Sequence, residues 1–314
     1  MSEALRDGAG APRTPLSAPS APTPLREKAI RLGSGGSLVG ILTESPDPDA
    51  KARPGVVLVN SGILHRVGAC RLHVTLARAL ARDGYHALRF DFSGIGDSSV
   101  RRDDLSFEAS AVVELQDAMN QLASARGNAA FVVMGLCSGA DVALAASQVD
   151  ARIVGLGLFD PWAYRTPRYY LTHYGPRLFR PSVWANAIRV RLGGHGAASE
   201  FPTIANGVSE DELELPTYVR EFPPREEAER HLRALVERGV QLCCVFTGGQ
   251  SDHYNYEGQF RDAFRSVELG RNLREHYLAA ADHIFTDLAH QRFLVETLRD
   301  WMAAHWPVPG PSAA

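Results

Sequence analysis

Apolar residues along the chain form two alternating patterns, short continuous runs and longer runs at helical spacing. Short continuous runs are typical of strands that are buried on both faces of a sheet. Such runs predict strands at residues 56–59, 87–90, 129–134, 153–159 and 240–246, and a shorter one at 276–278. Apolar positions at helical spacing predict helices between them, at 72–80, 106–122, 140–146, 225–238 and 293–302. The alternation predicts an α/β fold with a mainly parallel sheet that helices cover on both faces.

Two segments depart from this alternation. Residues 28–32 and 38–43 flank a glycine-rich turn and predict a β-hairpin, which adds antiparallel strands at one edge of the sheet. Residues 161–224 are rich in prolines and aromatic residues and show no strand pattern, so we expect an inserted lid above the carboxyl ends of the strands. The core would then consist of residues 25–160 and 225–306.

The N-terminal segment differs in composition from this core. Residues 1–24 are rich in Ala, Pro, Ser and Gly and contain too little apolar surface to offset the entropy lost on ordering. We predict that this segment is disordered and that residues 307–314 form a flexible tail.

Composition and charge exclude several classes of function. Of the 314 residues, 45% are hydrophobic, which is enough for a sizeable core, and the net charge of -3 gives no general attraction to nucleic acid. No apolar stretch reaches the roughly 18 residues that span a membrane, and the N-terminus lacks the apolar region of a secretory signal. We therefore expect a cytoplasmic protein with no membrane span and no nucleic-acid partner.

The four cysteines are Cys70, Cys137, Cys243 and Cys244. They show no C-x-x-C spacing, so we expect no metal site, and no disulfide framework, which suits a reducing compartment. Cys243 and Cys244 are neighbours in an apolar run and should point to opposite faces of a strand as small core residues.

Cys137 is the centre of the stretch Gly135-Leu136-Cys137-Ser138-Gly139, with a predicted strand before it and a helix of small residues after it. In a G-x-nucleophile-x-G turn the central side chain projects above the sheet, and the flanking positions are small because strand and helix nearly touch. We interpret Cys137 as a thiol nucleophile. The alternative is a buried, inert cysteine in a glycine-rich turn.

A nucleophilic thiol needs a base, and the base needs an orienting carboxylate. His283 follows the last predicted strand and is the predicted base, while His253 and His290 are weaker candidates because neither directly follows a strand. Asp252 lies in the loop after the predicted strand at 240–246 and is the preferred acid. Asp160, directly after the strand that ends at residue 159, is the alternative acid.

The oxygen that becomes negative during acyl transfer needs backbone donors. We expect one from the amide of Ser138 and a second from the loop Asn60-Ser61-Gly62-Ile63, where the Ile63 amide is favoured. An ordinary strand-to-helix loop is the alternative. The predicted substrate contacts, in this loop and in the lid, are Gly62, His65, Trp162 and Tyr169.

The stretch Asp91-Phe92-Ser93-Gly94-Ile95-Gly96-Asp97-Ser98 follows the predicted strand at 87–90. A G-x-G loop can bind phosphate, but the lysine of a nucleotide P-loop is absent. We favour a structural turn beneath the rim of the site.

With these residues in place, the chain resembles the α/β-hydrolase superfamily over roughly residues 26–306. The resemblance rests on Asp91-x-x-Gly94-x-Gly96-x-Ser98, on the turn at 135–139 and on Asp282-His283. The order Cys137, Asp252, His283 agrees with that family. The stretches 60–68, 90–98 and 135–137 are more narrowly similar to exosortase A system-associated hydrolases. The resemblance implies an α/β-hydrolase fold.

This chain departs from most members of the superfamily, which carry serine at the position of Cys137. A thiolate is a strong nucleophile beside histidine, and its acyl intermediate is a thioester. Thioesters react readily with amines and thiols, which favours acyl transfer relative to hydrolysis more than an ester would. Dienelactone hydrolases and polyester synthases resemble this arrangement, so hydrolysis and transfer both stay open.

The predicted lid is basic at its start. Residues 161–199 contain no acidic residue and six arginines, namely Arg165, Arg168, Arg177, Arg180, Arg189 and Arg191. An anionic partner, such as a phosphopantetheine-bearing acyl carrier protein or a substrate carboxylate, would suit that surface. Arginines solvated over a packed aromatic lid are the alternative.

The leading hypothesis is a cysteine acyl enzyme, a thioesterase or acyltransferase, that cleaves or transfers the ester or thioester acyl group of a small molecule. The substrate can be free or presented on an acyl carrier protein, and no cofactor is expected. The alternatives are a non-catalytic ligand-binding protein of the same fold and a lyase or isomerase that uses the same pocket. The oligomeric state is open, with a homodimer as one option.

Overall fold

The fold is organised around one large sheet in a computed structural model that describes residues 24–178, 220 and 222–307. Eight strands follow the order β1-β2-β4-β3-β5-β6-β7-β8. From β4 to β8 the neighbouring strands are parallel, whereas β1 and β2 run antiparallel at one edge. The strands are β1 (Arg26–Leu32), β2 (Leu38–Glu44), β3 (Gly55–Val59), β4 (Ala87–Phe90), β5 (Phe131–Leu136), β6 (Ile153–Phe159), β7 (Gln241–Thr247) and β8 (Leu273–Leu278).

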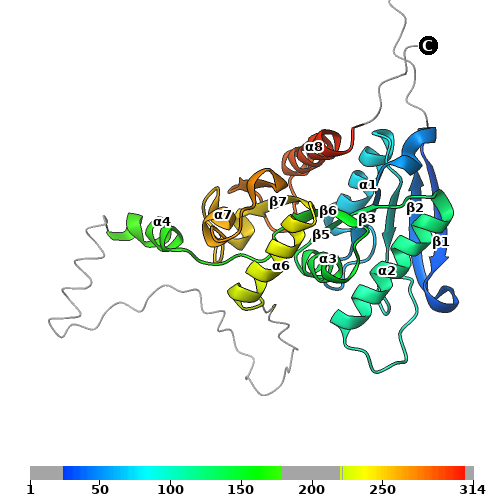
Figure 1. The fold of residues 1–314 in the computed structure, drawn as a ribbon, viewed down its shortest axis with the longest axis horizontal. Helices are drawn as coiled ribbons and strands as arrows, with labels where there is room; N and C mark the ends of the chain where they lie inside the picture. Colours follow the sequence, from blue (N-terminus) through cyan, green and yellow to red (C-terminus); the bar gives the residue numbers. More distant parts are fainter. Residues whose placement is uncertain (1–23, 179–219, 221, 308–314) are drawn as a thin grey trace, which may run out of the picture.

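Helices cover both faces of this sheet. The described helices are α1 (Leu72–Arg82), α2 (Phe107–Arg126), α3 (Ser138–Val149), α4 (Pro167–Leu178), α6 (Arg225–Glu237), α7 (Gln259–Ala263) and α8 (Leu288–His305). Helices α1 and α8 pack on one face, and α2, α3 and α6 pack on the other (Figure 1). The predicted class, a mostly parallel, doubly covered sheet with an antiparallel N-terminal hairpin, is therefore confirmed.

Alternating side chains of the central strands fill two separate apolar clusters. In β3, Val56 and Leu58 belong to the cluster under α1 and α8, whereas Val57 and Val59 belong to the cluster under α2, α3 and α6. The neighbouring cysteines of β7 divide in the same way, and both are fully buried. The prediction that they point to opposite faces of a strand is confirmed.

Local sequence signals explain where α2 begins and ends. The Ser106 hydroxyl accepts a hydrogen bond from the Ala109 amide at 3.3 Å, which caps the first turn. Gly127 follows the last turn with a φ of 79°, a left-handed conformation that glycine adopts at little cost.

Some elements differ from the expectation. β8 is longer than the predicted 276–278, because its buried first residue, Leu273, is followed by partly buried polar residues rather than by a continuous apolar run. Helices α4 and α7 were not predicted, since α4 is interrupted by prolines and glycine and α7 is one turn long. None of the described helices combines the length and apolar character that crossing a membrane requires.

Parts of the predicted domain plan lie outside the described residues. These are residues 1–23 of the predicted tail, residues 179–219 and 221 of the predicted lid, and residues 308–314.

Candidate active site

Cys137 lies at the turn between β5 and α3, one residue past the end of the strand. Its φ is positive, at 55°, with ψ -120°, which is strained for a residue with a side chain and is typical of functional turns. A Cβ atom on Gly135 would collide with the backbone of Gly139, and one on Gly139 would lie 2.6 Å from the Asn60 carbonyl oxygen. The strand and helix thus approach as closely as the G-x-C-x-G pattern requires.

Asp160, the alternative acid, is the carboxylate that pairs with His283. Its Oδ2 atom lies 2.7 Å from His283 Nδ1, and the side chain is fully buried. Thr247 fixes the same carboxylate, because its amide donates to Oδ1 at 2.7 Å and its hydroxyl donates to Oδ2 at 2.7 Å. Like Cys137, Asp160 has a positive φ, of 47°, and it directly follows its strand. With Nδ1 engaged by Asp160, the other ring nitrogen of His283 is left to face Cys137.

The structure does not place the preferred acid, Asp252, beside His283. Asp252 is exposed, and its backbone carbonyl, not its carboxylate, accepts hydrogen bonds from Arg165 and from the Tyr169 hydroxyl, each at 2.8 Å. The loop that carries Asp252 instead supports the histidine through Gly249, where a Cβ atom would lie 2.9 Å from His283 Cα. The physical reason is that a carboxylate one residue past β6 reaches His283, whereas β7 is followed by a tight turn that directs Asp252 to solvent.

A hydrogen bond joins the predicted oxyanion loop to the nucleophile turn. The Gly62 amide donates to the Ser138 hydroxyl at 2.8 Å, and Gly62 has a φ of 50°. The side chain of Ile63 is 92% exposed, so only its backbone can serve the site. The amides of Ser138 and Ile63 stay the predicted oxyanion donors.

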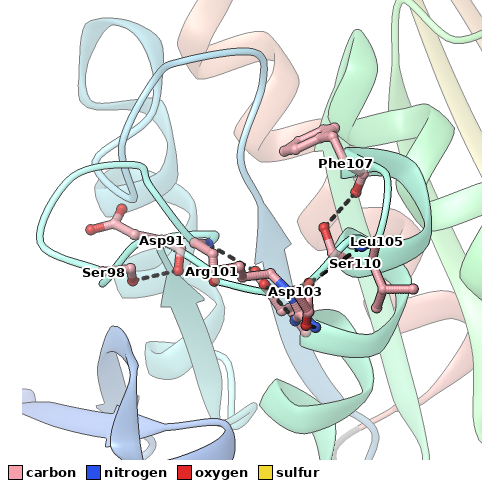
Figure 2. A network of polar contacts seen from close by, with 9 residues as sticks. Asp91, Ser98, Arg101, Asp103, Leu105, Phe107 and Ser110 are labelled. Carbon is pink, nitrogen blue, oxygen red and sulfur yellow. Dashed lines mark hydrogen bonds and ion pairs between the residues drawn. The ribbon is translucent and has the colours of Figure 1, made fainter.

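The Asp91 turn is structural, and it anchors the oxyanion loop. The Asp91 carboxylate is fully buried and accepts hydrogen bonds from both the backbone amide and the guanidinium of Arg66. The Asp97 amide donates to the same carboxylate at 3.2 Å. The Ser98 hydroxyl donates a hydrogen bond to the Asp91 carbonyl oxygen at 2.7 Å (Figure 2). The turn therefore holds the 60–68 loop in place from below, as the interpretation of a structural turn expected.

Arg220 is a residue of this site that the sequence did not indicate. Its Nη1 atom lies 3.7 Å from Cys137 Sγ and donates to the Asp160 carbonyl at 2.9 Å. Two further donors of the guanidinium bind the Asp141 carboxylate at 2.6 Å each. Arg220 lies far along the chain in a segment whose sequence shows no periodicity, so no pattern marked it. The sequence signal that could have indicated a nearby cation is Asp141, the acidic residue in the first turn of α3.

The charges around the thiol favour its ionised form. Burial raises the pKa of Cys137, but the hydrogen bond with His283, the charge of Arg220 and the Ser138 amide outweigh burial and bring the pKa below its ordinary value. The hydrogen bond to Asp160, helped by the one to Cys137, raises the pKa of His283 to about 9. Both shifts favour a thiolate beside an imidazolium.

A cavity of about 450 Å³ opens beside the nucleophile turn along α3. Ser138 and Asp141 form its end nearest Cys137, and its walls are largely apolar. The walls include Phe107, Val142, Ala145, Trp162, Phe222 and Pro223. Arg101, paired with Asp103 and Glu114, fixes the chain that leads Phe107 to this wall (Figure 2).

The four predicted substrate contacts separate in the structure. Trp162 lines this cavity, whereas His65 lines a different one of about 400 Å³ beside Arg66 and Arg89. Tyr169 is 3% exposed and its hydroxyl binds backbone carbonyls, so it holds the loop of Asp252 rather than presenting a surface. Gly62 stays next to the site through its bond to Ser138.

Two of the six lid arginines have described side chains. Arg165 lies 5.6 Å from the centre of the Tyr169 ring, and Arg168 lies 4.3 Å from the centre of the Tyr256 ring. Both therefore pack on aromatic faces, one inside the predicted lid and one outside it. The side chain of Arg177, and Arg180, Arg189 and Arg191, lie outside the described residues. Within the described ranges, no group of three or more His, Cys, Asp or Glu side chains is placed to hold a metal ion.

Comparison with known proteins gives matches of structure alone. No protein-family model matches the chain, and no curated protein matches it by sequence. An esterase from Pyrococcus furiosus is similar, with a TM-score of 0.56 and 13% identity over 90% of this chain and 92% of the esterase. A dienelactone hydrolase from Anabaena variabilis gives a TM-score of 0.51 and 13% identity over 90% of this chain and 98% of that chain. An α/β serine hydrolase homologue from Coxiella burnetii gives a TM-score of 0.50 and 12% identity over 88% and 96%. Together with the sheet order, these similarities show that the chain has the α/β-hydrolase fold.

Proposed function

We propose that the protein is a cysteine-dependent acyl enzyme that cleaves or transfers the acyl group of an ester or thioester. The observation that carries the proposal is the alignment of Asp160, His283 and Cys137, which come from the ends of three parallel strands. The 2.7 Å contact between Asp160 and His283 supports a base that is fixed in one orientation. The strained turn with positive φ at Cys137 supports a nucleophile that is held clear of the sheet.

In the first half of the proposed reaction, Cys137 Sγ attacks the acyl carbon and forms a C–S bond. The carbonyl oxygen takes the negative charge, which the amides of Ser138 and Ile63 would stabilise. Collapse of this intermediate breaks the bond to the leaving oxygen or sulfur atom. That atom receives the proton of the His283 imidazolium, while Asp160 keeps the ring in place.

In the second half, neutral His283 takes a proton from water or from another acceptor, which then attacks the thioester carbon. The C–S bond breaks, and Cys137 leaves as a thiolate beside the imidazolium that has just formed. With water the product is a carboxylic acid, and with an alcohol, amine or thiol it is the transferred acyl compound. The largely apolar cavity along α3 supports an acyl part with an apolar chain.

The proposal is tested by intact mass spectrometry after incubation with a series of activated acyl thioesters of increasing chain length. We expect an acyl adduct on the wild-type protein that peptide mapping assigns to Cys137. The adduct should vanish in Cys137→Ala and persist in Cys70→Ser, which removes an exposed cysteine outside the site. An adduct that survives in Cys137→Ala would rule out this nucleophile, and added amine or alcohol acceptors would separate transfer from hydrolysis.

A further inference from the structure

The arginine beside the nucleophile is held by the Asp141 carboxylate and by the backbone carbonyl of Asp160. The Arg220 side chain is 12% exposed, and its pairing with Asp141 uses both the Nε and one Nη2 hydrogen, at 2.6 Å each. Such a two-point pairing fixes the plane of a guanidinium as well as its position. The carbonyl oxygen of Asp160 holds a third point at 2.9 Å.

The number of N–H donors on Arg220 limits what else its guanidinium can bind. A guanidinium has five N–H donors. Asp141 takes two of them, the Asp160 carbonyl takes one on Nη1, and the second hydrogen of Nη1 is directed at Cys137 Sγ, 3.7 Å away. One Nη2 hydrogen remains, which is too few for two-point recognition of a substrate carboxylate. The geometry therefore suits a fixed positive charge that faces sulfur, and it does not suit a substrate-binding arginine.

We propose that Arg220, oriented by Asp141, holds Cys137 as a thiolate in the enzyme before substrate arrives. This inference rests on the proposed nucleophile and adds a second cation to the one that His283 supplies. As a consequence, the proton that the leaving group needs already resides on His283 in the resting enzyme. Attack on the substrate then needs no proton removal from Cys137.

Two cations act on the thiol, and two carboxylates bind those cations from the surrounding elements. His283 approaches from the loop after β8 and Arg220 from the segment before α6, while Asp141 lies on α3 and Asp160 follows β6. Each carboxylate is bound to one of the two cations, so neither is left unpaired against the sulfur. The N-terminus of α3 adds its partial positive charge at the same point.

The test measures the ionisation of Cys137 without any substrate. The full-length protein is treated with iodoacetamide between pH 4 and 10, with about one measurement per half pH unit. Peptide mass spectrometry gives the alkylation rate at each cysteine. We expect Arg220→Met to raise the apparent pKa of Cys137 by about 1 to 2 units. Below both pKa values, the alkylation rate at Cys137 should then fall by roughly 10- to 100-fold. Alkylation of the exposed Cys70 in the same samples should not change, and Arg230→Met, at an exposed arginine of α6, should leave Cys137 unchanged.

A double variant separates the proposed contact from a side effect. Arg220→Met leaves the Asp141 carboxylate unpaired beside the thiol, which by itself would raise the pKa of Cys137. In Arg220→Met/Asp141→Asn a neutral amide replaces that carboxylate, so the protein avoids a partly buried unpaired charge and should fold even if the single variant does not. We expect the pKa of Cys137 to stay raised in the double variant. A return to the wild-type value, or no change in either variant, would overturn the proposal.

This test also keeps the proposal distinct from the acyl-enzyme function. If the alkylation of Cys137 depends on Arg220 but no acyl adduct forms with any thioester, the proposed role of Arg220 is supported and the acyl-enzyme function is ruled out. If acyl adducts form and the pH profile of Cys137 alkylation is the same with and without Arg220, the acyl-enzyme function is supported and the proposed role of Arg220 is ruled out.

Discussion

Two cysteine sites on the same sheet illustrate how differently one side chain can behave. Cys137 directly follows β5 and Cys244 lies in β7, two parallel strands that are separated by β6 alone. Cys244 lies inside β7, fully buried in the apolar cluster, and burial raises its pKa well above the ordinary value. Cys137 lies one residue past the end of β5, where His283 and Arg220 hold its pKa below the ordinary value in spite of burial.

The difference teaches that the position in the fold, and not the residue type, makes a thiol reactive. A residue inside a strand meets the side chains of the covering helices, which are apolar here. A residue one step past the strand end meets the loops at the carboxyl edge of the sheet, and the loops after β6 and β8 supply Asp160 and His283. The turn with positive φ at Cys137 places the thiol in the second environment rather than the first.

The largest expected effect addresses which thiol carries the reaction. We expect Cys137→Ala to lower kcat/KM for an activated acyl thioester by at least about 10⁴-fold, because the covalent route is removed. Cys244→Ala should keep kcat/KM within about 3-fold while lowering the free energy of unfolding by about 1 kcal/mol through a small cavity. Steady-state kinetics and chemical unfolding of both variants check this. Loss of turnover in Cys244→Ala would contradict the assignment of Cys137 as the reactive thiol.

The next expected effect concerns the carboxylate that distinguishes the reactive site. Asp160→Asn should lower kcat by about 10³-fold or more, because His283 loses the group that orients it and stabilises its charged form. The matched variant Asp252→Asn should change kcat by less than about 3-fold, since the carboxylate of Asp252 is exposed and makes no contact with His283 in the described residues. Kinetics with one acyl thioester decide between them. A larger loss in Asp252→Asn would restore the acid that the sequence favoured.

A third expected effect tests whether the close approach of strand and helix creates the turn. Gly135→Ala places a methyl group against the backbone of Gly139, so we expect it to lower the free energy of unfolding by about 2–4 kcal/mol and to reduce acyl-adduct formation. The control is Gly175→Ala in α4, where a Cβ atom meets nothing within 4 Å. That variant should be neutral or more stable by up to about 1 kcal/mol. Equal stability of the two variants would contradict the proposed packing constraint.

The smallest expected effect is a pH dependence that separates two histidines. In a histidine NMR titration, we expect His283 to deprotonate at about pH 9 and His73, whose pKa burial lowers, at about pH 4. Because the folded pKa of His283 is raised, its contribution to stability is fully present below about pH 6.5 and is lost as the pH rises through about 9. His73 acts in the opposite sense, since its buried neutral form costs stability as the pH falls from about 6.5 towards 4. The signal at high pH should disappear in His283→Gln, and its persistence would assign it to another group.

The sequence predicted the fold well because two periodicities carry it. Continuous apolar runs marked the buried parallel strands, and helical spacing marked the covering helices. The turn at Cys137 was also predictable, since its glycines are demanded by backbone contacts that no other residue would allow. His283 could be named because it follows a strand, on the edge of the sheet where the thiol lies.

What the sequence could not decide depends on the direction of single residues. Asp160 and Asp252 both follow strands next to the site, and the choice between them depends on the positive φ of Asp160 and on the two donors of Thr247. Arg220 reaches Cys137 from an irregular segment whose path no periodic pattern encodes. Pairings over such sequence separations are set by tertiary structure alone.

The hydrogen bonds between Arg66 and Asp91 anchor the oxyanion loop locally, so this part of the site and the Asp160–His283 pair should unfold at different stages. These hydrogen bonds link residues 25 positions apart, within the first parallel strands and the helix between them, whereas the Asp160–His283 contact spans 123 positions. Under mild denaturant, opening of the C-terminal strands would release His283 while the oxyanion loop stayed anchored. Hydrogen exchange should therefore find the amides near Arg66 protected under conditions in which turnover has already ceased.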